Sequence, residues 1–199
     1  RAWVPSKQDN VRRGTLRNRQ NLDFQNTVRA VSSRLDLSAA MPVELTDRRV
    51  DHDNASLAAA AVHDPTGAYL FVALETSRQV AVLDAVRGAQ LARVEVELAP
   101  QALAVSPDGR TLYVQNFMSR TVSRVDLTSL MTQGRITLPA PLVVSSIATE
   151  RLSPAVLSGK QLFYDARDER LSLDSYMSCA TCHNDGGHDG RTWDLTGLG

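Results

Sequence analysis

Two stretches of this chain, Asp64–Asp84 and Ser106–Asp126, share one pattern of hydrophobic and polar positions. Each begins with a Pro-x-Gly turn and continues with two runs of β-branched, aromatic and aliphatic residues separated by a short polar turn. Alternation of this kind is typical of paired β-strands. The pattern predicts strands over residues 69–73, 79–83, 111–115 and 121–125.

The two stretches align without a gap. Pro65 and Pro107 are 42 positions apart, and the glycines and the closing aspartates of the two copies keep the same spacing. Further strands are expected at 89–98 and 134–138, and a partial earlier copy at 27–45. A four-stranded unit that recurs about every 40–45 residues is typical of a β-propeller blade. A plain antiparallel meander in a sandwich is the alternative.

The second copy resembles the YVTN-type propeller repeat of bacterial surface and periplasmic proteins. The match lies in SPDGR (106–110), LYVQN (112–116) and VSRVD (122–126), with Gln115 in place of the family threonine. The resemblance implies an exported protein, located in the periplasm or at the cell surface. Propellers close with about 4–8 blades. Because this chain contains about two to three, we expect it to begin partway through a longer propeller.

The composition changes after Ala140. Residues 141–153 are rich in Pro, Ser and Thr and are interpreted as a linker. Ser153 and Pro154 then form an N-cap followed by proline at the first helical position, which predicts a short helix over 154–166. The expected organisation is a partial propeller at 1–140, with repeats near 61–98 and 103–138, the linker, and the N-terminal part of a haem c domain at 154–199. The expected fold class is mainly β, followed by the start of a small α-helical c-type cytochrome domain.

Both cysteines of the chain lie in one motif, Cys179-Ala-Thr-Cys182-His183. Cys-x-x-Cys-His is the attachment site of c-type haem. Two thiols three positions apart on a helical turn reach the two vinyl groups of one porphyrin, and the next residue brings its imidazole to the iron. We therefore expect covalent haem at Cys179 and Cys182, with His183 as the proximal iron ligand.

Three other interpretations of the motif are weaker. A zinc site needs four ligands, and His188 is the one nearby residue that would complete the set. A dithiol redox motif would follow a strand in a βαβ unit. A disulfide across two intervening residues gains little loop entropy.

The residues around the motif resemble the N-terminal haem segment of the bacterial di-haem cytochrome c peroxidase family. The matching positions are Gly159, Leu162, Phe163, Asp165, Arg167 or Arg170, Leu171, Ser172, Ser178, Cys179, Cys182, His183, Asp189, Gly190 and Arg191. Extra residues between Asp165 and Leu171 leave open which arginine takes the family role.

This resemblance implies a haem-dependent oxidoreductase that reduces peroxide with electrons from a small donor protein of the cytochrome c or cupredoxin type. It implies a second haem, expected beyond the C-terminus, and calcium as a further candidate cofactor. It does not identify catalytic residues or a distal ligand. An electron-transfer cytochrome without peroxidase activity and a propeller-based binding module are the alternatives.

Other candidate residues have weaker signals. His188 lies in a Gly-rich turn five positions after His183, where a surface role is favoured over iron ligation. Met177 is expected to pack against the porphyrin, and Trp193 either near the haem edge or in a core. Met118 and Met131 are expected to be core or contact residues of the propeller.

Charge and hydropathy exclude some classes of partner. The 199 residues carry 22 Lys and Arg against 22 Asp and Glu, so no net charge favours nucleic acid or an anionic membrane. A basic cluster at Arg12, Arg13, Arg17 and Arg19 is interpreted as a solvated loop. No run of 18 apolar residues is present, so no membrane-spanning helix is expected.

Overall fold

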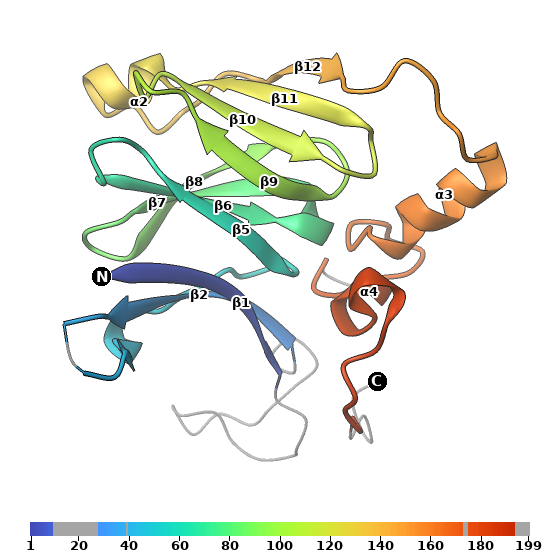
Figure 1. The fold of residues 1–199 in the computed structure, drawn as a ribbon, viewed down its shortest axis with the longest axis horizontal. Coiled ribbons are helices and arrows are strands. Elements are labelled where there is room, and N and C mark those ends of the chain that lie inside the picture. Colours follow the sequence, from blue (N-terminus) through green and yellow to red (C-terminus); the bar gives the residue numbers. More distant parts are fainter. Residues whose placement is uncertain (10–27, 39, 173–174, 194–199) are drawn as a thin grey trace.

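Three four-stranded antiparallel sheets are stacked face to face, and a small helical segment packs against one end of the stack (Figure 1). The computed structural model describes residues 1–9, 28–38, 40–172 and 175–193. The basic cluster at residues 12–19 and part of the predicted copy at 27–45 lie outside the described residues.

The first sheet contains β1 (Ala2–Asp9), β2 (Val28–Asp36), β3 (Val43–Glu44) and β4 (Val50–Asp51). The second contains β5 (Ala58–His63), β6 (Tyr69–Leu74), β7 (Gln79–Asp84) and β8 (Ala89–Glu95). The third contains β9 (Pro100–Val105), β10 (Thr111–Asn116), β11 (Thr121–Asp126) and β12 (Leu142–Ser145). In the second and third sheets the strands pair in sequence order, as in propeller blades. The fold is therefore mainly β, with a partial propeller, as predicted.

The 42-residue repeat is confirmed strand by strand. Tyr69 pairs with Asp84 in the second sheet, and Thr111 pairs with Asp126 in the third. The turns before these strands are also equivalent, because Gly67 and Gly109 have φ values of 73° and 72°. Their N–H groups donate to the carbonyls of Asp64 and Ser106 at 3.0 and 2.8 Å. Since glycine enters this left-handed region without steric cost, the Pro-x-Gly spacing fixes both turns.

The predicted strand at 134–138 is wrong. Helix α2 (Thr128–Gln133) follows β11 and ends at Gly134, whose φ of 66° closes it as a left-handed cap. The outer strand of the third sheet is instead β12, which pairs with β11. This strand lies inside the segment that composition indicated as a linker. Its central Val143–Val144 pair is the local strand signal that the surrounding Pro and Ser residues mask.

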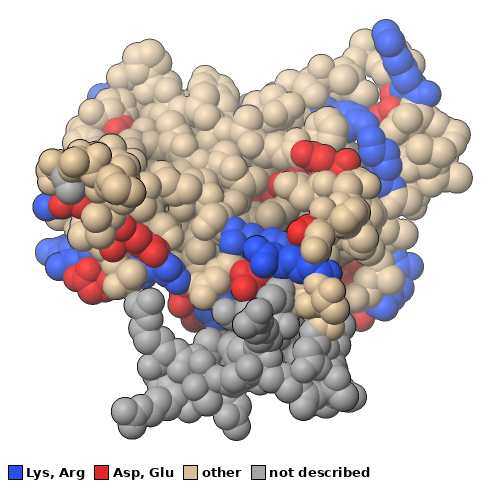
Figure 2. Space-filling model, turned by 60° about the horizontal axis from the view of Figure 1, so that its bottom comes forward, with Lys and Arg blue, Asp and Glu red and all other residues tan. Residues whose placement is uncertain are grey.

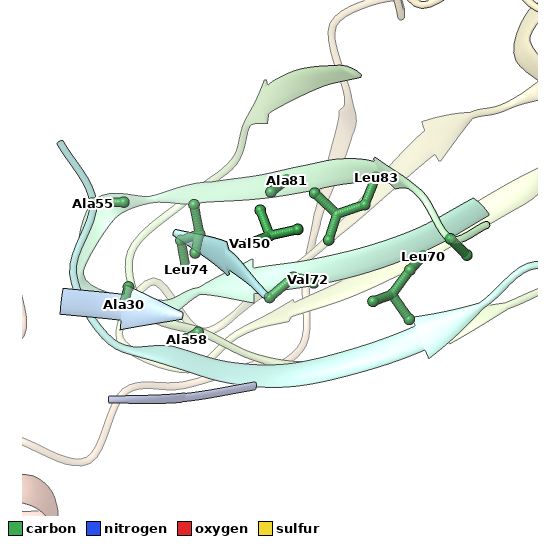
Figure 3. Close-up of a cluster of buried hydrophobic side chains, with 10 residues drawn as sticks. Ala30, Val50, Ala55, Ala58, Leu70, Val72, Leu74, Ala81 and Leu83 are labelled. Carbon is green, nitrogen blue, oxygen red and sulfur yellow. The ribbon is translucent and has the colours of Figure 1, made fainter. Parts of the chain in front are cut away.

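The second sheet is buried on both faces, because its side chains divide alternately between two cores. Leu70, Val72 and Leu74 of β6 face the first sheet, and Phe71 between them faces the third. Figure 3 shows the first core, which contains Ala30, Val50, Ala55, Ala58, Leu70, Val72, Leu74, Ala81 and Leu83. The second core joins Phe71, Val80, Val82 and Val94 to Leu112, Val114, Val125, Leu127 and Leu130.

The third sheet is buried on one face only. Leu112 and Val114 of β10 are fully buried, whereas Tyr113 between them is 42% exposed. Tyr113 is the repeat equivalent of the buried Phe71. Its exposure marks the face of the third sheet that no described residue of a further sheet covers.

Candidate functional site

The Cys-x-x-Cys-His motif forms a single helical turn, α4 (Cys179–Cys182). Ala180 and Thr181 are buried, Cys179 is exposed and Cys182 is half-buried. Successive residues of a helix are about 100° apart, so the two cysteines lie opposite the two residues between them. The turn therefore attaches to the propeller through Ala180 and Thr181, which leaves Cys179 exposed and Cys182 half-buried beside β1 and the start of β5.

Polar contacts hold the Thr181 side of α4. The hydroxyls of Ser56 and Thr181 share a buried hydrogen bond of 2.8 Å. Lys7 of β1 donates from Nζ to the carbonyl of Thr181 at 2.7 Å. The N–H of Ser178 donates to the Thr181 hydroxyl at 2.9 Å, which caps the turn.

Apolar contacts hold the Ala180 side. Ala180 packs in a small buried cluster with Ala99, Met118 and Tyr164. Ala99 directly precedes β9 and Met118 lies in the β10–β11 turn, so this cluster joins the motif to the propeller. The prediction that Met118 and Met131 are core or contact residues of the propeller is confirmed, because Met118 is fully buried in this cluster and Met131 packs, partly buried, against the second core.

His183 directly follows α4 and is exposed. Its Nδ1 lies 2.8 Å from the carbonyl oxygen of Gly187. A carbonyl oxygen only accepts, so Nδ1 carries the proton and Nε2 is the ring nitrogen with a free lone pair. A ligating histidine is oriented in this way by its second nitrogen. The short 3-10 turn η3 (Asn184–Gly186) brings Gly187 back to the imidazole.

The segment before the motif is docked on the propeller by repeated positions of two blades. Helix α3 (Pro154–Phe163) begins at Ser153, whose hydroxyl accepts from the Val156 N–H, as predicted. The carbonyl of Thr76 accepts from the N–H of Ala166 at 2.8 Å, and the carbonyl of Met118 accepts from Gln161 at 3.2 Å. Thr76 and Met118 are 42 positions apart, so each blade offers the same acceptor.

Two arginines repeat this arrangement. Arg78 and Arg120, also 42 positions apart, have φ values of 55° and 56° in their turns. Arg78 binds the buried carboxylate of Asp165 with two nitrogens, the longer contact being 3.1 Å. Arg120 pairs with Glu150 at 3.1 Å. Equivalent turns of both blades therefore bind the segment before α4, at Glu150 and at Asp165.

The two arginines that the family resemblance left open have different partners. Arg167 crosses to Glu95 of β8, and Arg170 pairs with Asp168 in its own turn. Of the two, Arg167 is the one that contacts the propeller.

Burial of Cys182 disfavours a redox dithiol at this motif, and the described residues do not form a closed metal site. Both cysteines are free, and burial raises the pKa of Cys182. A redox dithiol requires the opposite direction, a pKa lowered toward the thiolate. Among the described residues, no group of three His, Cys, Asp or Glu side chains lies close enough to hold a metal ion. The four residues considered for zinc are therefore not gathered.

His188 is exposed, and its Nδ1 accepts the N–H of Gly190 at 3.0 Å. Trp193 donates from its indole N–H to Asp189 at 2.9 Å, and Lys7 lies 5.9 Å from the centre of its ring. Met177 is half-buried. These contacts tie the end of the described chain to β1.

Two open hollows flank α4. One, of about 570 Å³, lies between α3 and the β10–β11 turn. The other, of about 550 Å³, lies between β1, the start of β5 and Cys182. Glu75 lines the second hollow, accepts from Gln101 at 2.7 Å, and has a pKa raised by burial. Figure 2 shows basic and acidic side chains intermixed on the underside of the molecule, without a large patch of one sign.

The sequence pattern singles out Cys179, Cys182 and His183 but not the residues that hold α4 on the propeller. Ser56 and Lys7, which bind Thr181, lie far from the motif in sequence and belong to no recognisable pattern. Equivalence between blades is a signal for Arg78 and Arg120 and for Thr76 and Met118, because the members of each pair occupy the same position of the repeat.

No protein-family model matches the chain, and no curated protein matches it. Among solved structures, it is similar to Kuenenia stuttgartiensis hydrazine synthase, with 37% identity over 34% of this chain and 19% of that one and a TM-score of 0.34. It is also similar to the periplasmic gluconolactonase PpgL of Pseudomonas aeruginosa, at 16% identity over 63% and 38% of the two chains and a TM-score of 0.47.

The β-propeller domain of Myceliophteria thermophila Cps50 (Swd1) is a further similar structure, at 15% identity over 62% and 43% of the two chains and a TM-score of 0.49. The chain thus spans between 19% and 43% of the length of these three proteins. Within the described residues, no helix is long and apolar enough to cross a membrane.

Proposed function

We propose that this chain attaches one c-type haem through Cys179 and Cys182, with His183 as the proximal iron ligand. The observation that carries the proposal is the orientation of His183. Its Nδ1 donates to Gly187 at 2.8 Å, which leaves Nε2 available in the residue that follows the two free thiols. These residues fit the group in number and spacing.

Haem bound in this way supplies an iron that changes between the ferrous and ferric states. The chain's own residues have two tasks here. The carbonyl of Gly187 holds the imidazole in one tautomer. Ala180 and Thr181 fix α4 on the propeller, because both are buried against residues of other elements. A rigid support of this kind keeps the ligand geometry constant while the charge of the iron changes.

For the whole protein we propose an exported haem-dependent oxidoreductase of the di-haem cytochrome c peroxidase type, fused to a YVTN-type propeller. It would reduce peroxide with electrons from a small cytochrome c or cupredoxin, and would carry a second haem. The support is the resemblance of residues 159–191 to that family.

An electron-transfer cytochrome is the second candidate. One observation favours it, because Cys179 and His183 are both exposed and the haem edge at this site would face solvent. An exposed edge suits electron exchange with a partner protein.

The test of haem attachment is expression with a c-type cytochrome maturation system, followed by a denaturing gel stained for haem. We expect the wild type to stain and the Cys179→Ser/Cys182→Ser variant to lose the stain. A variant that stains as strongly as the wild type would refute the attachment. Rapid mixing of the reduced full-length protein with peroxide then separates the two candidate functions, because an electron-transfer cytochrome stays unreactive.

A further inference from the structure

The hollow between α3 and the β10–β11 turn has apolar walls that face open space. Phe117 of the propeller and Val156 and Phe163 of α3 form these walls. Val156 is 51% exposed. A Cβ placed on Gly159 would meet no atom within 4 Å, so this face of the helix is unobstructed. An apolar hollow of this kind is suited to a flat hydrophobic group.

The hollow adjoins the motif. Asp185 and Gly186, which follow His183 closely, form its rim on that side. Tyr164 lines the hollow and packs directly against Ala180 of α4. By helical geometry, Cys179 lies on the Ala180 side of the turn and Cys182 on the Thr181 side. Cys179, Cys182 and His183 do not line this hollow themselves, but a flat group held by Cys179 would extend past Ala180 toward it.

One cation lies on the wall. Lys160 projects from α3, and its Nζ is 5.8 Å from the centre of the Phe117 ring. Arg120 lies on the same ring, but it is paired with Glu150. Lys160 has no carboxylate partner among the residues that the structure describes. Asp185, the acidic residue of the rim, lies against Tyr164, whose pKa is raised by burial and by that carboxylate.

We propose that this hollow receives the haem attached at Cys179 and Cys182, with Phe117 of the propeller against the macrocycle and Lys160 paired with a propionate. The inference rests on the proposed attachment of haem. It makes the propeller part of the cofactor site, because Phe117 lies in the turn between β10 and β11. A haem is mostly apolar and carries its two carboxylates on one edge, which matches apolar walls with a single cation.

The first test fills the hollow. Gly159→Leu places a side chain in the open space, and Ser158→Leu makes the same change at the next position of α3, an exposed residue outside the hollow. Both variants are prepared as holoproteins and compared by Soret circular dichroism and by haem content per chain. We expect Gly159→Leu to shift or abolish the Soret signal and Ser158→Leu to retain it.

The second test removes the cation. A positive charge beside a propionate favours the reduced haem, so Lys160→Gln is expected to lower the reduction potential and Lys160→Arg to restore it. Arg110→Gln, at the opposite end of β10, is the control and should leave the potential unchanged. Covalent haem with unchanged Soret dichroism in Gly159→Leu and an unchanged potential in Lys160→Gln would overturn this inference and leave the proposed function intact. A wild type without covalent haem would overturn both.

Discussion

The hydroxyls of Ser56 and Thr181 share a buried hydrogen bond of 2.8 Å across 125 positions of sequence. Ser56 precedes the first strand of the second sheet, and Thr181 lies between the two cysteines. The residues between the thiols are thus the part of the motif that binds the propeller. The thiols and the imidazole are left for the haem that we propose.

This contact predicts a specific loss of stability. Thr181→Val keeps the shape of the side chain but leaves the Ser56 hydroxyl buried without its partner, at a cost of about 1–3 kcal/mol. Urea unfolding measures the change. Thr181→Ser should recover most of the loss, and Thr192→Val, at an exposed position, should have little effect. Equal stabilities of Thr181→Val and the wild type would contradict the role of this bond.

The ion pair between Arg78 and Asp165 predicts a larger effect than a surface pair. Asp165 is 5% exposed, so Arg78→Met leaves its carboxylate buried without its counter-ion. We expect a loss of about 1–3 kcal/mol in unfolding free energy and faster proteolysis after Tyr164. Arg87→Met, which removes the exposed pair with Asp84, is the matched control and should cost less than about 1 kcal/mol. Equal losses of unfolding free energy in the two variants would show that Arg78 does not stabilise the buried carboxylate of Asp165 more than a surface ion pair would.

His52 predicts how stability depends on pH. It is fully buried, its Nε2 lies 2.9 Å from the Ser32 hydroxyl, and its Nδ1 lies 3.2 Å from Oε1 of Gln90. Burial lowers the pKa of His52 to about 4, below the ordinary value of 6.5. The unfolded chain therefore binds a proton that the folded chain excludes between these values, so stability falls as pH drops from about 6.5 toward 4.

The full loss from His52 is at most about 3 kcal/mol. Unfolding free energies of wild type and His52→Gln across this pH range measure it. We expect the variant to be less stable at neutral pH and to have a shallower slope. The same change at the exposed His63 should retain the slope. If the unfolding free energy of His52→Gln depends on pH as steeply as that of the wild type, groups other than His52 cause the pH dependence.

The repeat provides a matched pair of glycines. Gly67 and Gly109 have nearly the same positive φ, but a Cβ on Gly67 would meet nothing within 4 Å, whereas one on Gly109 would lie 3.3 Å from Cδ of Pro65. Gly67→Ala should cost about 1–2 kcal/mol from backbone strain alone. Gly109→Ala should cost more, because Pro65 must also shift. Thermal unfolding of the two variants gives the order, and a smaller loss at Gly109 would contradict it.

Much of the fold follows from local pattern. The strands that contain Tyr69 and Thr111 were predictable because each copy repeats turn chemistry and alternation in one register. The strand at Leu142 was not, because its apolar pair lies among prolines and serines that favour a linker by composition. The strand predicted at 134–138 does not form: the helix before it ends at Gly134 as a left-handed cap, and residues 134–138 have no regular structure.

The candidate site also has a part that the sequence pattern indicates and a part that it does not. Cys179, Cys182 and His183 stand out in the sequence because thioether attachment requires fixed spacing, and their role stays a prediction. Their supports do not stand out, because Ser56 and Lys7 reach the motif only after the sheets have packed. Long-range contacts of this kind depend on the tertiary arrangement and leave no local trace in the sequence.

We propose above that His183 ligates the iron of a haem attached at Cys179 and Cys182. The most direct measurement is the electron paramagnetic resonance spectrum of the oxidised holoprotein, compared with that of His183→Gly before and after addition of imidazole. We predict that the variant retains covalent haem, loses the signal of histidine ligation, and regains it with imidazole. A variant whose spectrum equals that of the wild type without imidazole would contradict the assignment of His183.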